Sequence, residues 1–230
     1  MRIKDALGVS LKSILNKEHN LWVGFSFGNK WFTRENLKNL IALGVKYTKQ
    51  SLLVWIPGRL YATNLKTFDN LSRAGALKMA FNIEEEKFLE VEDIRSEFCL
   101  EDQGKIVIAN YDDVLTPKTV KQREILMREF SKQEEFYNMV IEISNEMLEM
   151  RRRTISKERS ESAALYILQE LPLFLDGVMK IGNDVIYTAI LYPGLGKLDE
   201  LVIKIRNNDK FMYLKETLNI KNSVGIVDVE

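Results

Sequence analysis

Two short and almost entirely apolar runs constrain the fold of this chain more than any other feature. Residues 20–27 read NLWVGFSF and residues 51–56 read SLLVWI, which indicates two buried strands. The segment between them has the pattern of an amphipathic helix, with Thr33 suited to cap its start and Gly44 to end it. A strand, a helix and a second strand in succession predict a βαβ unit with parallel strands.

Further elements are expected along the rest of the chain. Helical spacing predicts one or two helices over 65–90, a long helical stretch over 117–150 and a helix over 160–175. Strands are expected at 105–109, 184–192 and 200–205. The apolar residues of the N-terminal segment also fall at helical spacing, which predicts an amphipathic helix there: Ile3, Leu7, Leu11, Ile14 and Leu15. Alternating strands and helices predict an α/β, doubly wound fold, taken as a single domain over residues 1–230.

The rarest residue types exclude several classes of site. Cys99 is the one cysteine, so an internal disulfide framework and a cysteine-based zinc site are excluded. His19 is the one histidine, which excludes metalloenzymes that need two. The sequence shows no apolar run of membrane-spanning length and no signal peptide, so a cytoplasmic protein without a membrane segment is expected.

The charges are balanced in total but unevenly placed. The 33 basic and 33 acidic side chains give a net charge of zero. Residues 84–102 hold nine acids and two bases, whereas residues 59–78 hold four bases and one acid. Such clusters are most often solvated helix faces, but a neutral chain of this kind can still present a basic surface to an anionic partner.

The turn after the first strand is the first candidate site. Gly24-Phe25-Ser26-Phe27-Gly28 places a serine between glycines at a strand end, where α/β folds build their sites. The spacing matches the Gly-x-Ser-x-Gly element of α/β-hydrolases, but those enzymes need a histidine after the serine, and His19 precedes it. A structural serine in a turn is the alternative.

Two later segments are the second and third candidates. Tyr166 and Glu170 are four residues apart, so a helix would place a phenol and a carboxylate on one face, able to clamp an ammonium group. Tyr192-Pro193 ends a late strand, where the tyrosine can point into a pocket. Each segment alone also fits a purely structural role.

Together, these three segments resemble the cyclodipeptide synthases. The Gly24-x-Ser26 motif, with Asn29 after it, and the Tyr166/Glu170 pair before Pro172-Leu173-Phe174 occur in the family's order over roughly residues 18–193. The resemblance implies a Rossmann-like domain, similar to class I tyrosyl- and tryptophanyl-tRNA synthetases. It also implies that two aminoacyl-tRNAs are joined into a cyclic dipeptide, with no cofactor and no metal, by an enzyme expected to be a monomer.

The resemblance also implies roles for individual residues. Ser26 would be the nucleophile, Tyr166 and Glu170 would hold the substrate ammonium, and Tyr192, with Tyr187 as the alternative, would relay a proton. Substrate would further be bound by Trp22, Gly24, Asn29, Val54 and Pro193. Contacts to tRNA would come from two basic groups: Lys66, Arg73 and Lys78, and Arg151, Arg152 and Arg153. A serine hydrolase with a non-histidine base and a catalytically silent RNA-binding domain remain alternatives, and the two amino acids joined cannot be read from the sequence.

Overall fold

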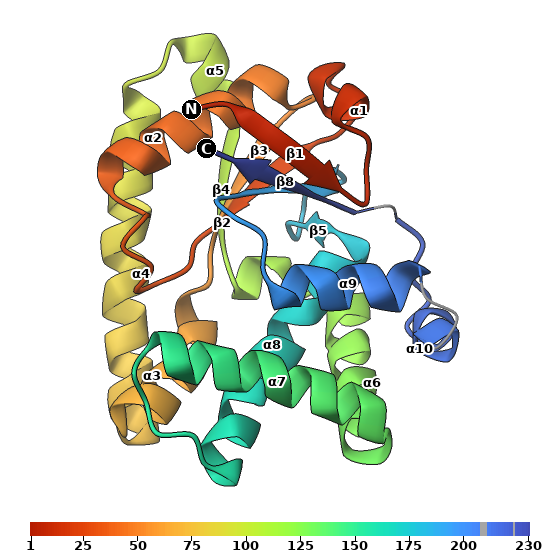
Figure 1. The fold of residues 1–230 in the computed structure, drawn as a ribbon. Coiled ribbons are helices and arrows are strands. Elements are labelled where there is room, and N and C mark those ends of the chain that lie inside the picture. The colour runs from red at the N-terminus through yellow and green to blue at the C-terminus, as the bar shows by residue number, and fades with distance from the viewer. Residues whose placement is uncertain (208–210, 223) are drawn as a thin grey trace.

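A six-stranded sheet organises the molecule (Figure 1). The computed structural model describes residues 1–207, 211–222 and 224–230. The strand order is β1-β8-β7-β2-β3-β4, and β5 and β6 form a separate two-stranded sheet. The strands of the main sheet are β1 (Ile3–Leu7), β2 (Leu21–Gly24), β3 (Leu52–Ile56), β4 (Ile106–Asn110), β7 (Ala189–Tyr192) and β8 (Gly225–Val229), and the small sheet pairs β5 (Val178–Met179) with β6 (Ile186–Tyr187).

All neighbours in the main sheet are parallel except β1, which pairs antiparallel with β8 at one edge. From β2 the chain winds outward through β3 and β4, and it later returns to the other side of β2 as β7 and β8. The strand order therefore reverses between β2 and β7. In open α/β sheets such a reversal opens a crevice at the carboxyl ends of the two strands, the usual place for a ligand.

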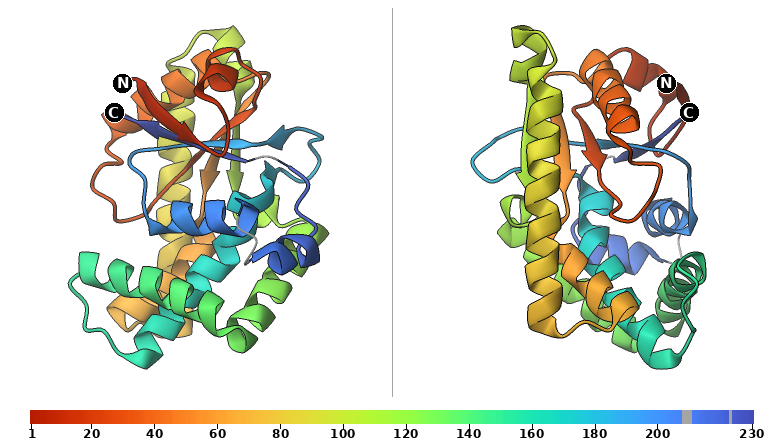
Figure 2. Two further views of the ribbon diagram at one scale, coloured as in Figure 1. Left: turned by 45° about the vertical axis from the view of Figure 1, so that its right-hand side comes forward. Right: turned by 90° about the vertical axis from the view of Figure 1, so that its left-hand side faces the viewer.

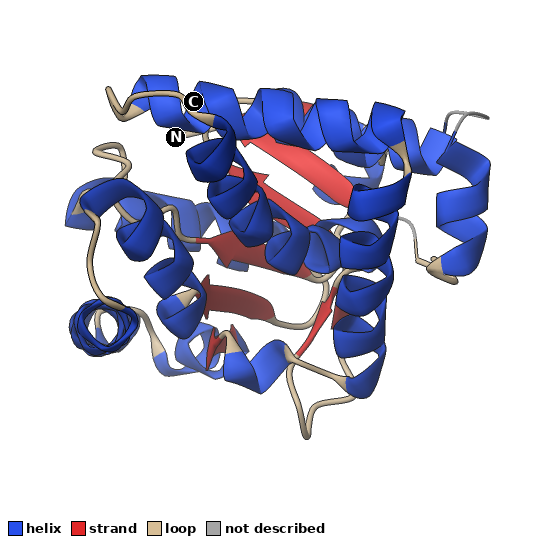
Figure 3. Ribbon diagram, turned by 90° about the horizontal axis from the view of Figure 1, so that it is seen from below, coloured by secondary structure: helices blue, strands red, loops and turns tan. Residues whose placement is uncertain are grey.

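Helices cover both faces of this sheet (Figure 3). The face that carries Val23 and Val54 packs against α1 (Leu11–Leu15), α2 (Arg34–Tyr47) and α4 (Arg73–Ser96). The opposite face, with Trp22 and Trp55, packs against a layer of five later helices: α6 (Pro117–Lys132), α7 (Glu134–Met150), α8 (Lys157–Asp176), α9 (Lys197–Asn207) and α10 (Met212–Thr217). The predicted Rossmann-like, doubly wound architecture with a mostly parallel sheet is confirmed.

The remaining elements connect these layers. A short 3₁₀ turn (Gly58–Leu60) leads from β3 into α3 (Tyr61–Asp69), and α5 (Leu100–Lys105) precedes β4. A second 3₁₀ turn (Asp112–Val114) follows β4. Figure 2 shows α4 running beside the sheet along most of the height of the molecule. Among the described residues, each helix is too short or too polar to cross a lipid bilayer.

Three sequence predictions of secondary structure were wrong, and the strand expected over 184–192 is divided between β6 and β7, which belong to different sheets. The N-terminal helix is instead β1 followed by the short α1, because Gly8, at φ +77°, interrupts the segment and Ile3–Leu7 pairs with the distant β8. Residues 200–205 belong to α9, whose buried Leu201, Val202 and Ile205 fit a helical face. The helical stretch 117–150 is two helices, broken at Gln133, which is extended (φ −108°, ψ 106°).

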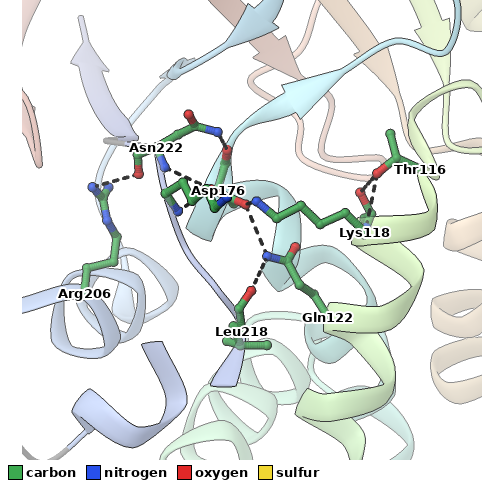
Figure 4. A network of polar contacts seen from close by, with 9 residues as sticks. Thr116, Lys118, Gln122, Asp176, Arg206, Leu218 and Asn222 are labelled. Atoms are coloured by element: carbon green, nitrogen blue, oxygen red, sulfur yellow. Dashed lines mark hydrogen bonds and ion pairs between the residues drawn. The ribbon is translucent and has the colours of Figure 1, made fainter. Parts of the chain in front are cut away.

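A buried carboxylate ties the C-terminal segment to two helices of the layer under the sheet (Figure 4). Asp176, at the end of α8, accepts hydrogen bonds from the backbone N–H groups of Lys221 and Asn222, both at 3.0 Å. It also accepts one from Gln122 Nε2 at 3.2 Å and pairs with Lys118, both on α6. These contacts position the chain just before β8, which in turn pairs with β7.

We therefore expect Asp176→Asn to destabilise the fold by about 2–4 kcal/mol, because an amide cannot satisfy this set of donors. Burial alone would raise the pKa of Asp176, but hydrogen bonds from Lys118 and from the backbone of Asn222 and Lys221 hold the net pKa below its usual value. The carboxylate thus stabilises the fold above its unfolded pKa, about 3.9, and this stability is lost as the pH falls through the lower folded pKa.

Urea unfolding of wild type and Asp176→Asn at pH 7 and pH 3 measures both effects. The difference between the two proteins should shrink at pH 3. Asp69→Asn is the control. Asp69 makes a half-exposed ion pair with Arg153, so its substitution should lower the free energy of unfolding much less. Equal losses in the two variants would contradict the proposed importance of the buried contacts.

Candidate active site

The reversal point of the sheet brings Ser26 and Tyr192 together. Ser26 lies two residues beyond the end of β2, and Tyr192 is the last residue of β7, the parallel neighbour of β2. The Tyr192 phenol contacts the side chains of Ser26 and Asn29. Burial raises the pKa of Tyr192 above its ordinary value, and these two contacts oppose the shift. The phenol is therefore protonated at neutral pH and can pass a proton to or from Ser26.

The other candidate tyrosine, Tyr187, lies at the opposite end of the sheet. Its hydroxyl is 2.9 Å from Oγ of Ser51, the residue that precedes β3, and its side chain is fully buried. The adjacent Thr188 donates its backbone N–H to Asn20, just before β2. Tyr187 therefore belongs to the amino ends of the strands, and Tyr192 is the tyrosine beside Ser26.

Helix α8 contributes a buried phenol and carboxylate to the site. Ser156 caps the helix by accepting from the N–H of Arg159, and Tyr166 and Glu170 are each 8% exposed. Burial raises the pKa of Glu170 to about 8, a shift that Tyr166 opposes by donating a hydrogen bond and Asp199 increases by its charge. Burial and the charge of Glu170 also raise the pKa of Tyr166 well above its usual value. A carboxylate at this position gains strongly from a cationic ligand, because none of the lysine or arginine side chains that the structure describes is hydrogen-bonded to it.

Two aspartates that sequence reasoning missed complete the surroundings. Asp199, in the first turn of α9, accepts the N–H of Gly196 at 2.7 Å, and burial raises its pKa to about 6. Asp228 on β8 accepts the N–H of Gly194 at 2.9 Å and so fixes the loop after Tyr192. Asp199 directly precedes residues 200–205, which were expected to form a strand. Asp228 lies in β8, a strand that was not expected. No local sequence pattern therefore indicated either aspartate.

The turn residues Asn29 and Pro193 flank the Ser26–Tyr192 contact. The Asn29 backbone N–H donates to the Ser26 carbonyl at 3.0 Å, and its side-chain oxygen accepts from the N–H of Trp31 at 3.0 Å. Pro193 follows Tyr192 and leads into Gly194, whose φ of +83° suits glycine. Both predicted residues therefore border the site, and each belongs to a turn that begins at a strand end.

The expected grouping of Trp22, Gly24 and Val54 needs a correction. Trp22 and Gly24 face the side of α8, but Val54 pairs in register with Val23 and packs on the opposite face of the sheet. Side chains alternate between faces along a strand, so the neighbour that shares the face of Gly24 is Trp55. A Cβ at Gly24 would lie 3.3 Å from Trp22 and 3.6 Å from Trp55, and Trp22 also packs edge-on against Phe174.

The predicted tRNA contacts fall in different settings. Lys66 on α3 and Arg73 at the start of α4 line one cavity of about 470 Å³ together with Arg59, which sequence reasoning missed. Lys78 is exposed on α4 and does not line this cavity. In the other group Arg152 is exposed and Arg153 pairs with Asp69, whereas Arg151 turns toward the Ser26 loop.

Comparison with known proteins identifies the family. The sequence model of the cyclodipeptide synthases matches residues 5–208. The chain belongs to the cyclodipeptide synthase family. Members of this family are tRNA-dependent aminoacyltransferases that make cyclodipeptides, and the chain is an enzyme of this class. No curated protein matches it in sequence.

Solved structures show the same fold at low identity. A cyclodipeptide synthase from Bacillus thermoamylovorans has a TM-score of 0.75 at 20% identity, covering 95% of this chain and 91% of its own. One from Fluoribacter dumoffii has a TM-score of 0.71 at 12% identity, covering 99% and 98%. One from Candidatus Glomeribacter gigasporarum, bound to Phe-tRNAPhe, has a TM-score of 0.58 at 16% identity, covering 91% and 87%. A Mycobacterium tuberculosis neighbour is described as related to type I tRNA synthetases.

Proposed function

We propose that this cyclodipeptide synthase works by ping-pong acyl transfer through Ser26. The contact of Tyr192 with Ser26 and Asn29, beside the buried Tyr166–Glu170 pair, is the observation that carries the proposal. Ser26 Oγ attacks the ester carbonyl of a first aminoacyl-tRNA, and the ribose oxygen of the tRNA leaves as a hydroxyl. The amine of a second aminoacyl-tRNA then takes the acyl group from Ser26. Ser26 Oγ next attacks the ester carbonyl of the resulting dipeptidyl-tRNA, and the ribose oxygen of the second tRNA leaves as a hydroxyl. The free amine of the dipeptidyl-enzyme then attacks its Ser26 ester, which releases the diketopiperazine and restores the serine hydroxyl.

Each of these residues has one role in the proposed reaction. Glu170, held by Tyr166, binds the ammonium of the first aminoacyl group by a charge-assisted hydrogen bond. Tyr192 transfers the proton at the cyclisation step. Backbone N–H groups of the turn at Gly28 stabilise the oxyanion. Serine is a weak nucleophile, but the aminoacyl ester is already activated, so the reaction needs neither ATP nor a histidine base.

Large side chains fill the face of the sheet beside Gly24. Trp22 and Trp55 are fully buried and pack edge-on with ring centroids 5.9 Å apart, on the face of the sheet that Gly24 shares. Ile190 on β7 closes the same wall, 3.4 Å from the position of a Cβ at Gly24. We therefore assign the first substrate to aminoacyl groups with side chains of about the size of glycine, alanine or serine.

Incubation with a mixture of charged tRNAs, followed by mass spectrometry of the small-molecule fraction, tests the function. A diketopiperazine is the expected product, and its mass, fragment ions and chromatographic comparison with standards identify the two amino acids. Free amino acids alone would indicate a hydrolase. Binding of tRNA without any turnover would indicate a silent RNA-binding domain.

The basic cavity provides the tRNA contacts in this proposal. Arg59, Lys66 and Arg73 surround it, next to the hydroxyl of Thr63 and the amide of Gln169, which suits a backbone phosphate. Gln169 precedes Glu170 on α8, so a phosphate there would lie near the catalytic residues. The acidic segment 84–102, on the later part of α4 and on α5, would face away from the RNA except at Glu84, which lies against Gly58 and near Arg59 of the cavity.

Changing Lys66 and Arg73 together to alanine should weaken tRNA binding and lower the slope of log affinity against log salt by about two units. Filter binding at several salt concentrations measures the slope. The exposed Lys12 and Lys17, changed together to alanine, are the matched comparison at the N-terminus. A normal slope in the first variant and a reduced slope in the second would place the tRNA on the N-terminal segment instead.

A further inference from the structure

Arg151 reaches from the end of α7 into the turn that carries Ser26. It follows the last residue of α7, and the chain reverses at the next residue, Arg152, which has a left-handed φ of +52°. Backbone N–H groups of Arg152 and Arg153 close the helix end by donating to Glu149 and Leu148, at 2.8 and 2.9 Å. Arg152 and Arg153 are exposed after this reversal, whereas Arg151 is half-buried.

The guanidinium of Arg151 is held by the turn after β2 and by two residues of α3. Nη2 donates to the backbone carbonyl of Phe27 at 2.8 Å, and Nη1 contacts the hydroxyl of Tyr61 on α3 at 3.4 Å. The group also lies over the ring of Phe68, 5.1 Å from its centroid. Phe27 follows Ser26 directly, so a side chain from the α7–α8 connection is bonded to the backbone beside the nucleophile.

The same guanidinium packs against Gly28. A Cβ at that position would lie 2.7 Å from Nη1 and 3.0 Å from Nη2. Gly28 also has a backbone φ of +82°, which residues other than glycine rarely adopt. Gly28, the second glycine of the Gly-x-Ser-x-Gly segment, therefore leaves the space that the Arg151 guanidinium occupies.

Arg151 also lies close to the ammonium-binding pair. Burial and then Glu170 raise the pKa of the Tyr166 phenol, and Arg151 is the group whose charge opposes that shift. Arg151 thus joins the Ser26 turn to α3, with two of its donors directed at protein oxygens and its charge felt by Tyr166 on α8. Two of the five N–H donors of this guanidinium are used by Phe27 and Tyr61, so the protein fixes the orientation of the group.

We propose that Arg151 is a positioning residue, which holds the turn of residues 26–28 so that Ser26 Oγ faces the acyl group bound by Tyr166 and Glu170. The inference rests on the proposed role of Ser26. A fork-shaped guanidinium suits this task, because it can bond a carbonyl and a phenol at once and stack on an aromatic ring, which an ammonium cannot do together. A loss of geometry of about 1 Å at a reacting atom can cost about 10²-fold in rate.

Single-turnover acylation measures the effect. Wild type, Arg151→Met and Arg151→Lys are mixed with saturating aminoacyl-tRNA, and the aminoacyl-enzyme is quantified by intact-protein mass spectrometry. Arg151→Met should acylate about 10²-fold more slowly, and Arg151→Lys should be intermediate. Binding of tRNA and its salt slope should stay at the wild-type values in both. A slope lowered by about one unit would mean a phosphate contact and would overturn the proposal.

Arg206→Met is the matched control. Arg206 also donates to backbone carbonyl groups, those of Val224 and Asn222, but on the segment before β8. This variant should keep the wild-type acylation rate. Hydrogen exchange adds a second readout, because the Asn29 N–H donates to the Ser26 carbonyl and should exchange faster in Arg151→Met than in Arg206→Met. Unchanged exchange or unchanged acylation in Arg151→Met would refute the positioning role alone. Absence of acyl-enzyme in the wild type would refute the proposed function itself.

Discussion

Ser26→Ala is expected to abolish both the aminoacyl-enzyme and the cyclic product while leaving the free energy of unfolding within about 1 kcal/mol of wild type. Ser26 is partly exposed in a turn beyond β2, so removing its hydroxyl leaves no large cavity. The turn itself is held by backbone contacts, including the Asn29 N–H to Ser26 carbonyl hydrogen bond, which alanine retains. The contact of the Ser26 hydroxyl with Tyr192 is the interaction that this substitution removes.

Intact-protein mass spectrometry after mixing with aminoacyl-tRNA, together with thermal unfolding, measures the two expectations separately. Ser51→Ala is the matched control, because Ser51 also makes a serine–tyrosine hydrogen bond, to Tyr187, at the opposite end of the sheet. That variant should acylate and turn over normally. Product formation by Ser26→Ala would remove Ser26 from the nucleophilic role.

The centre of the sheet could be predicted because its signals are local. Strands β2 and β3 are short apolar runs, and the helix between them has both a capping threonine and an amphipathic face. The edge could not be predicted in the same way. Strand β1 exists because it pairs with β8, more than 200 positions later in the chain, and neither segment has the alternation of a half-buried strand.

The helical content of α9 was hidden for a different reason. A run such as ELVIKI is too short for its period to distinguish a strand from a helix. The structure resolves it through burial, since Leu201, Val202 and Ile205 face the core beneath the sheet. The mistaken strand also concealed Asp199, because an aspartate before a strand gives no reason to expect a buried carboxyl beside Glu170.

The sequence predicts those site residues that a single local motif places. It does not predict the residues that the fold brings together from distant segments. Ser26 follows its own strand, and the spacing of Tyr166 and Glu170 places both on one helical face. Val54 was misplaced because a shift of one residue in a strand reverses the face of every side chain. Arg151 looked like part of a basic surface cluster, and only the reversal of the chain at Arg152 separates it from its two neighbours.

Glu170→Gln should lower kcat/KM about 10- to 150-fold, with little change in tRNA affinity. The amide keeps the size of the side chain but loses the charge-assisted hydrogen bond to the substrate ammonium, which contributes about 1.5–3 kcal/mol. Steady-state kinetics and filter binding distinguish the two quantities. Glu161→Gln is the control on the same helix, because Glu161 accepts a hydrogen bond from Tyr137 at 2.9 Å on the surface, away from Ser26. Parallel losses of tRNA affinity and activity in Glu170→Gln would contradict an ammonium-binding role.

The raised pKa of Glu170 predicts how activity and stability change with pH. Burial first, and the charge of Asp199 second, raise the pKa of Glu170 from an ordinary value of 4.5 to about 8. The free enzyme must lose this proton before it can bind an ammonium, so kcat/KM should rise as the pH increases toward 8, and Glu170→Gln should lack that rise. The fold responds in the opposite direction, because a carboxyl that stays protonated in the folded state contributes stability below pH 4.5 that is lost as the pH rises through 8. Glutamine removes this loss, so Glu170→Gln should be at least as stable as wild type at pH 8 while being far less active. A variant that is both less stable and less active at that pH would assign Glu170 to the fold rather than to the substrate.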